Sequence, residues 1–180
     1  MVLKLVSDDI PHKTEHGLVA LGLADDAALE AAWKTLAARV AALGPVSVAG
    51  YLVQEMVRDG IEVFAGVARD PDFGLSIAFG FGGVEIELLR DFAMRMLPLR
   101  QGEAAAMIAE TRGAARLGPV RGRPPADVAS LVATLEALAD FAQAHADRIQ
   151  EIDLNPIKVR EQGRGCVVVD ALIVTNPAKE

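Results

Sequence analysis

The chain has 180 residues, 52% of them apolar, and 25 acidic residues against 18 lysines and arginines, which gives a net charge of −7. This length and apolar content allow a sizeable core, so we expect one folded domain or two small lobes rather than a disordered tail. The acidic net charge argues against nucleic-acid binding. No apolar run approaches the ~20 residues that span a bilayer, and no signal peptide is visible, which argues against a membrane span and against secretion. We therefore expect a cytoplasmic protein.

The first predicted elements are a strand and a helix. The chain starts directly with a strand-like apolar run at residues 1–7. An amphipathic helix then begins at Asp25 or Asp26 and ends at Leu43, before a Gly-Pro pair. Its apolar stripe, which we interpret as core, recurs at steps of three and four residues: Leu29, Trp33, Leu36, Val40 and Leu43.

The middle of the chain is predicted to form an antiparallel meander. Short apolar runs separated by the turn sequences RDG and DPDFG occupy residues 51–57, 61–69 and 75–81. Further strand-like runs follow at residues 84–89 and 92–99. Because the first three runs are short and separated by turn residues, we expect them to pair in sequence order.

The last part of the chain is predicted to contain two helices and a hairpin. The helices span residues 103–112 and 127–146, with a Gly/Pro-rich connector between them. The second helix has an apolar face formed by Val128, Leu131, Val132, Leu135, Leu138 and Phe141. Two strands, residues 151–159 and 166–174, follow on either side of a polar turn. Helices segregated around an antiparallel sheet make the fold class α+β.

The predicted hairpin carries oxygen ligands. Side chains at i, i+2 and i+4 of a strand share a face, so Glu151, Asp153 and Asn155 point the same way. Asp170 is the only charge in the run CVVVDALIV, and the hairpin brings it near Asn155. A buried carboxylate needs a partner, and Mg²⁺ with the phosphates of a nucleotide is one. The alternative is that these acids merely face solvent.

Other features have both a functional and a structural interpretation. The run FGFGG, residues 79–83, is either a phosphate-binding loop or a tight turn. Lys4, inside an apolar strand, either meets an anion such as phosphate or faces water on an edge strand. His12, in the loop IPHKTEHG, is either a nucleophile or proton carrier or an ordinary surface residue. We interpret the single cysteine, Cys166, as a small buried hydrophobe.

The order of these motifs resembles one family. The segments LKLVSDDIPHKTEHGLVALGL, LVQEMVRDGIEVFAGVARDPDFG, IAFGFGGVEIELLRDFAMRMLPL, and EIDLNPI followed by VVVDALI look like the ATP-grasp domain of NDP-forming acyl-CoA synthetases. This family includes the ADP-forming acetate–CoA ligases and relatives of the succinyl-CoA synthetase β-subunit. The resemblance covers residues 1–174. It implies an ATP-grasp-like fold and the conversion of an acid, CoA and ATP to acyl-CoA, ADP and phosphate, by way of an acyl phosphate and a phosphorylated histidine.

The resemblance also implies roles for individual residues of a nucleotide site. Lys4 would contact the ATP phosphates, and Glu62 would hold the ribose hydroxyls. The hinge that reads adenine would consist of Glu55, Met56 and Val57. The glycine-rich segment and the run after it would contribute Gly82, Gly83, Glu87 and Asp91.

Two further assignments concern the metal and the phosphate carrier. Asn155 and Asp170 match the family's Mg²⁺ ligands, with Asp153 and Glu151 nearby. His12 matches the histidine of the family segment HKSDVGG, which is proposed to carry phosphate between distant sites. Here the segment reads HKTEHGL, so leucine replaces a glycine at its last position, a change that would stiffen or reshape the loop.

Compared with the family, the chain lacks several dozen residues before its first strand, and the CoA-binding and succinyl-CoA-ligase-like domains. We therefore expect a partial ATP-grasp domain, with the remainder of the first lobe at 1–50, the second lobe at 51–174 and a tail at 175–180. We expect an ATP-binding subunit or fragment that depends on a partner chain with CoA-binding and phosphohistidine domains, is inactive alone and forms an oligomer. The alternative is a nucleotide-binding or regulatory module, or an inactive remnant, without turnover.

Overall fold

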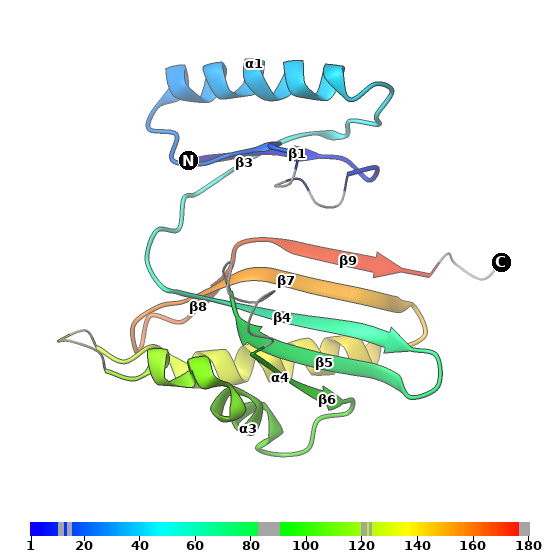
Figure 1. Ribbon diagram of the computed structural model, residues 1–180, viewed down its shortest axis with the longest axis vertical. Helices are drawn as coiled ribbons and strands as arrows, with labels where there is room; N and C mark the ends of the chain where they lie inside the picture. The colour runs from blue at the N-terminus through cyan, green and yellow to red at the C-terminus, as the bar shows by residue number, and fades with distance from the viewer. Residues whose placement is uncertain (11–12, 14–15, 83–90, 120–121, 123, 177–180) are drawn as a thin grey trace. The chain divides into compact units, whose positions relative to one another are not determined.

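The computed structural model describes residues 1–10, 13, 16–82, 91–119, 122 and 124–176, and the chain divides into two compact units, Met1–Arg58 and Asp59–Glu180 (Figure 1). The first unit contains β1 (Val2–Val6), β2 (Val19–Ala20), α1 (Asp26–Ala42) and β3 (Gly50–Gln54). The second contains β4 (Ile61–Asp70), β5 (Gly74–Phe81), β6 (Phe92–Met96), α3 (Glu103–Glu110), the 3-10 helix η1 (Arg112–Leu117), α4 (Val128–Ala144), β7 (Ile149–Val159), β8 (Cys166–Val168) and β9 (Ala171–Thr175). The predicted α+β class is confirmed, and the predicted run 84–89 lies outside the described residues.

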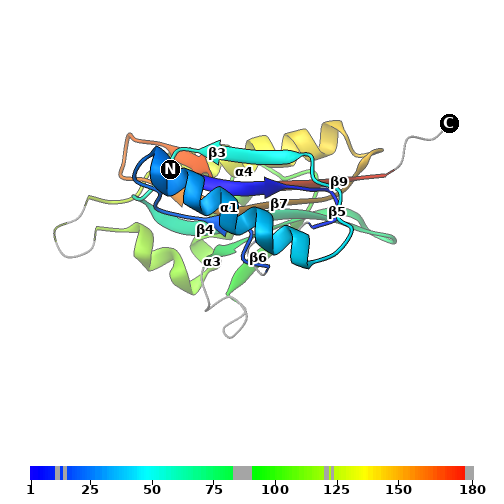
Figure 2. The same cartoon turned by 90° about the horizontal axis from the view of Figure 1, so that it is seen from above.

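In the first unit, α1 lies over a small sheet with the strand order β2-β1-β3 (Figure 2). The helix begins where the sequence predicted, because the Asp25 carboxylate accepts a hydrogen bond of 2.8 Å from the Ala28 N–H. The core between helix and sheet is built from Leu5, Leu18 and Val40.

The apolar stripe of α1 is only partly covered. Leu36 and Val40 are buried, as predicted, whereas Trp33 and Leu43 are 46% and 44% exposed. The interpretation of the whole stripe as core was therefore wrong at both of these positions.

The partner of β3 differs from the prediction. Residues 51–57 were expected to pair with the next strand in a meander, but β3 pairs with β1 along its whole length. The turn-like sequence before β4 serves another purpose: Gly60 has φ +111, and a Cβ there would lie 3.0 Å from the carbonyl oxygen of Val159. This glycine lets β4 and β7 approach each other and does not close a hairpin.

The second unit is a six-stranded sheet in the order β6-β5-β4-β7-β8, with β9 also paired to β7. The predicted pairing of the runs 61–69 and 75–81 is confirmed by β4 and β5, and β6 lies on the other side of β5. Helices α3 and α4 cover one face of this sheet (Figure 1). The side chains fully buried between the sheet and these helices include Val63, Ile77, Phe79, Met107, Leu131, Leu135 and Ile157.

Helix α4 confirms the predicted element but not the whole predicted face. Leu131, Leu135 and Leu138 are buried, whereas Val128 and Phe141 are 37% and 44% exposed. The core face is completed by Ala139 and Ala142 instead. Small side chains at these positions let the helix lie close to the sheet.

The other predicted helix ends earlier than expected. Helix α3 stops at Glu110, and η1 begins two residues later because the Asp91 carboxylate accepts hydrogen bonds of 2.8 Å from the N–H groups of both Arg112 and Gly113. Of the helices in the described ranges, none has the length and apolar character to cross a bilayer.

The predicted final strand is interrupted. Strands β8 and β9 both pair with β7, so the expected hairpin is confirmed, but Val169 and Asp170 lie between them outside any strand. The interruption coincides with an irregularity in β7, which defines the candidate site.

Candidate functional site

The irregularity is a β-bulge between β4 and β7. Val63 pairs with Ile157 and Ala65 pairs with Leu154, so Asn155 and Pro156 together lie opposite the single residue Phe64. The extra residue bends the strand and shifts its side-chain alternation by one position.

Asn155 and Asp170 meet at this bulge. The Asn155 N–H donates a hydrogen bond of 3.1 Å to the carbonyl oxygen of Asp170, and the Val169 N–H donates one of 2.9 Å to that of Pro156. Asn155 is exposed and Asp170 is half-buried. The predicted proximity of Asn155 and Asp170 is therefore confirmed at the level of the backbone, while their role as metal ligands stays a prediction.

The acids that precede the bulge lie on the sheet face opposite α3 and α4. Ile152 is buried in the helix-covered core, so its neighbours Glu151 and Asp153 point to the other face, opposite Ala68 and Gly66 of β4. The predicted shared face of these two acids is confirmed.

The oxygen atoms of Asn155 and Asp170 could hold a hard cation such as Mg²⁺ only if a bound ligand supplied further oxygen atoms. Among the residues that the structure describes, no group of three or more His, Cys, Asp or Glu side chains could hold a metal ion. Asn155 and Asp170 would offer one amide and one carboxylate oxygen. Mg²⁺ is commonly held by one or two carboxylates together with substrate phosphates and water, so these residues fit the ion when a nucleotide supplies phosphate oxygens.

Glu62 lies beside this region and is fixed by two neighbours. Its Oε1 lies 2.8 Å from Nζ of Lys158, which stands opposite it in the β4–β7 ladder. Its carbonyl oxygen accepts a hydrogen bond of 3.0 Å from the Gly82 N–H. Sequence reasoning missed Lys158, although a lysine within the apolar run NPIKV is the same signal that singled out Lys4.

Gly80, inside the glycine-rich run, has a packing role. It is buried in β5, and a Cβ there would lie 2.5 Å from Cε1 of Phe64 and 2.8 Å from the carbonyl oxygen of Asp91. The absence of a side chain at Gly80 therefore makes room for the ring of Phe64, the residue that pairs opposite the bulge. Gly83 and Glu87 lie outside the described residues.

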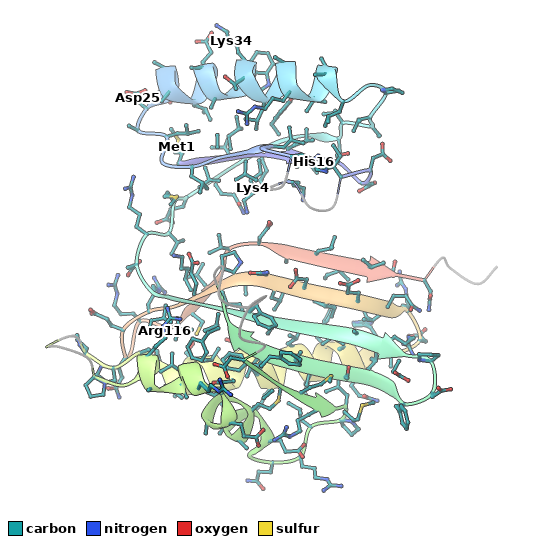
Figure 3. The ribbon with its side chains drawn as sticks, in the orientation of Figure 1. Met1, Lys4, His16, Asp25, Lys34 and Arg116 are labelled. Atoms are coloured by element: carbon teal, nitrogen blue, oxygen red, sulfur yellow. The ribbon has the colours of Figure 1, made fainter. Side chains whose placement is uncertain are left out.

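In the first unit, Lys4 lies on the central strand β1, so the edge-strand alternative was wrong. It is 6% exposed and projects from the sheet face opposite α1, as Figure 3 shows. The predicted hinge residues Glu55, Met56 and Val57 follow β3, with Glu55 exposed and the other two half-buried.

The segment that carries His12 is described only in part, and His12 itself lies outside the described residues. Leu18, which replaces a glycine of the family pattern, is fully buried. Its N–H donates to the carbonyl oxygen of Lys13 at 2.9 Å, and its own carbonyl oxygen accepts from the Leu5 N–H at 3.1 Å. Leu18 therefore anchors the end of this segment to β1.

Two ionisable groups away from the bulge have perturbed acidities. Backbone hydrogen bonds, with those from Gly165 and Ser130 the strongest, hold the pKa of Asp127 below its ordinary value. Burial raises the pKa of the Cys166 thiol, which packs half-buried against the core. Cys166 therefore packs against the core as a small hydrophobe, but it is half-buried and not buried as predicted.

Two grooves in the described part of the chain lie apart from these residues. One lies between α4, β7 and β9 and is lined mainly by apolar side chains, including Leu138, Phe141 and Ile173. The other lies in the first unit beside Trp33 and Tyr51. Neither of these two grooves is lined by Glu62, Asn155 or Asp170.

Comparisons with known proteins give a consistent result. The model of a protein family described as an ATP-grasp domain matches residues 1–175. The β subunit of ADP-forming acetate–CoA ligase II from Pyrococcus furiosus is 35% identical over 175 residues, which are 97% of this chain and 74% of that subunit.

Solved structures agree in fold. The crystal structure of PH1788 from Pyrococcus horikoshii has a TM-score of 0.92 at 34% identity, covering 98% of this chain and 75% of that one. A dinucleotide-forming acetyl-coenzyme A synthetase 1 from Ca. Korarchaeum cryptofilum, in complex with coenzyme A and Mg-AMPPCP, has a TM-score of 0.80 at 31% identity, covering 98% and 76% of the two chains. The chain therefore belongs to the ATP-grasp domain family and is similar, over almost its whole length, to the β subunit of an ADP-forming acetate–CoA ligase.

Proposed function

We propose that this chain is the ATP-binding subunit or fragment of an ADP-forming acyl-CoA synthetase, which converts a carboxylic acid, CoA and ATP to acyl-CoA, ADP and phosphate. The observation that carries the proposal is the meeting of Asn155 and Asp170 at the β7 bulge, in a chain that matches the ATP-grasp family along its length. The relative from Ca. Korarchaeum cryptofilum, which was solved with coenzyme A and Mg-AMPPCP, supports the choice of ligands.

Within this proposal, the residues singled out in the sequence keep the roles that the family resemblance implies. Lys4 and the glycine segment at Gly82 and Gly83 contact phosphates, Glu62 accepts hydrogen bonds from ribose hydroxyls, and the hinge at residues 55–57 reads the base. Asn155 and Asp170 would hold Mg²⁺, and Glu87 remains one of the proposed nucleotide-binding residues. When bound, the ion would neutralise phosphate charge and fix the orientation of the transferred phosphoryl group.

The proposal includes a partner chain that supplies the CoA-binding and phosphohistidine domains, in a cytoplasmic oligomer. The relatives compared here are longer than this chain, which covers 74% of the Pyrococcus furiosus subunit. Exposed apolar side chains in the first unit, such as Trp33, Leu52 and Val53, are compatible with a protein contact there. A nucleotide-binding or regulatory module without turnover is the alternative.

The first prediction is that Mg-ATP stabilises the folded chain. A ligand that binds only the native state at 100 times its Kd adds about 2.7 kcal/mol, which corresponds to a rise in Tm of roughly 5 to 10 °C. Asp170→Asn and Asp170→Ala should abolish this rise, because the carboxylate is lost, while the exposed helix residue Asp140→Ala serves as a matched control. Melting curves with ATP, with and without Mg²⁺, provide the measurement, and an unchanged Tm at millimolar Mg-ATP would refute the proposed site.

The second prediction concerns turnover. The chain alone should form no acyl-CoA, because bringing ATP, acid and CoA together contributes about 7 to 11 kcal/mol to lowering the barrier. With a partner chain that binds CoA, ADP release should depend on acid and CoA. His12→Ala should remove both this activity and any acid-labile label from γ-labelled ATP, with His16→Ala as the matched control. Label retained in the His12 variant would place the phosphate elsewhere, and turnover by the purified chain alone would refute the partner requirement.

A further inference from the structure

The two side chains of the Lys158–Glu62 ion pair differ in their exposure to solvent. The side chain of Lys158 is 14% exposed, whereas that of Glu62 is 46% exposed. The lysine side chain is therefore largely covered, whereas the side chain of Glu62 remains partly accessible.

The packing around Lys158 fixes its direction. Ile157 and Val159, on either side of it in the sequence, are 0% and 1% exposed in the helix-covered core, so Lys158 must point to the opposite face. A Cβ at Gly60 would lie 3.2 Å from the Cβ of Lys158, which shows how closely the start of β4 passes its stem. The lysine is thus held in place by the β4–β7 ladder and by the close approach of Gly60.

This arrangement determines what Glu62 can do. An ionised carboxylate accepts hydrogen bonds through two oxygens, and Lys158 occupies one of them, Oε1. Because the backbone of Glu62 is also fixed by the Gly82 N–H, the second oxygen has a defined position without a ligand present. The lysine also balances the negative charge of Glu62, which would otherwise repel an anionic nucleotide.

We propose that Lys158 is a positioning residue of the nucleotide site, which holds the Glu62 carboxylate so that its second oxygen accepts hydrogen bonds from the vicinal hydroxyls of ribose. This inference rests on the proposed function, because it requires that the chain bind a nucleotide. It assigns Lys158 to ligand recognition through Glu62, since a partly exposed ion pair contributes little to folding stability.

The test compares two nucleotides on four variants. Affinity for Mg-ATP and for Mg-2′-deoxy-ATP is measured by calorimetry on the wild-type chain and on the Lys158→Met, Lys158→Arg and Glu62→Gln variants, with Lys34→Met as the control. Lys34 forms a similar pair with Glu30 at 2.7 Å, but on the exposed surface of α1. Lys158→Met should weaken ATP binding roughly tenfold and deoxy-ATP binding much less, because only the ribose contact depends on the orientation of Glu62.

The expected pattern has three further parts. Glu62→Gln should produce the same loss of discrimination, Lys158→Arg should restore most of it, and Lys34→Met should leave both affinities unchanged. The Tm of each variant without nucleotide should stay near that of the wild type. A wild-type chain that discriminates between the two nucleotides, combined with a Lys158→Met variant that discriminates equally well, would overturn this inference alone. A wild-type chain that binds neither nucleotide would overturn the proposed function as well.

Discussion

Replacement of Asp127 by alanine is expected to lower the Tm of the chain by roughly 5 to 10 °C. Asp127 precedes α4 and is 8% exposed. Its Oδ1 accepts a hydrogen bond of 3.1 Å from the Ser130 N–H, and its Oδ2 accepts two of 2.9 Å from the N–H groups of Gly163 and Gly165. One carboxylate therefore caps a helix and also holds the turn between β7 and β8, so its removal leaves three N–H groups without their acceptor.

The matched control for this substitution is Asp25→Ala at the start of α1. Asp25 also caps a helix, but it is exposed, and its carboxylate accepts a hydrogen bond of 2.8 Å from the Ala28 N–H. Loss of such a cap should lower the Tm by about 2 to 4 °C. Equal losses for the two variants, measured by thermal melting at neutral pH, would show that the turn at residues 163–165 does not depend on Asp127.

The dependence on pH has a defined sign. Because the backbone hydrogen bonds hold the pKa of Asp127 below its ordinary value of 3.8, the carboxylate contributes stability at pH values above that value. The contribution is lost as the pH falls through the lowered pKa of the folded state. The difference in Tm between the wild type and Asp127→Ala should therefore be constant from pH 7 to about pH 5 and shrink below pH 4. A difference that stays constant down to pH 2 would contradict this account.

Gly80→Ala is expected to destabilise the second unit by about 1 to 3 kcal/mol, because the new methyl group has no space. It would lie 2.8 Å from the carbonyl oxygen of Asp91, a backbone atom that cannot rotate away, and 2.5 Å from the ring of Phe64. Since Phe64 lies opposite Asn155 and Pro156, we also expect the stabilisation by Mg-ATP to fall.

The control for Gly80 is Gly118→Ala. A Cβ at Gly118 would make an ordinary contact of 3.5 Å with the carbonyl oxygen of Ala115, and φ is −73, a conformation that alanine adopts readily. Its unfolding free energy should change little. If Gly80→Ala proves as mild as Gly118→Ala in chemical denaturation, the close packing of Phe64 on β5 is not a requirement of the fold.

Local features of this fold could be predicted from the sequence. The spacing of apolar residues predicted α1 and α4, and Asp25 or Asp26 was expected at the start of α1, because helix periodicity and caps depend on neighbours within one or two turns. The alternation around Asp153 predicted the exposed face of β7, and the separation of the last two apolar runs by a polar turn predicted their pairing.

Features that depend on distant contacts could not be predicted in this way. The pairing of β3 with β1 joins strands that lie far apart in the sequence, with α1 between them, and no local pattern near residue 54 indicates it. The role of Gly80 depends on Phe64 from the neighbouring strand, so the sequence alone could not separate a packing glycine from a phosphate-binding one. Lys158 was missed because its partner, Glu62, lies almost a hundred residues earlier and meets it only through the ladder.

The bulge at Asn155 and Pro156 limits where residues can be inserted into β7 or deleted from it. Because of the extra residue, Asp153 and Lys158 share one face although they are five positions apart, an odd spacing that would place them on opposite faces of a regular strand. Deletion of one residue at the bulge would turn Lys158 into the core and Ile157 and Val159 out to solvent. A change of chain length should therefore be poorly tolerated at this surface position, because the number of residues is fixed by the core beneath it.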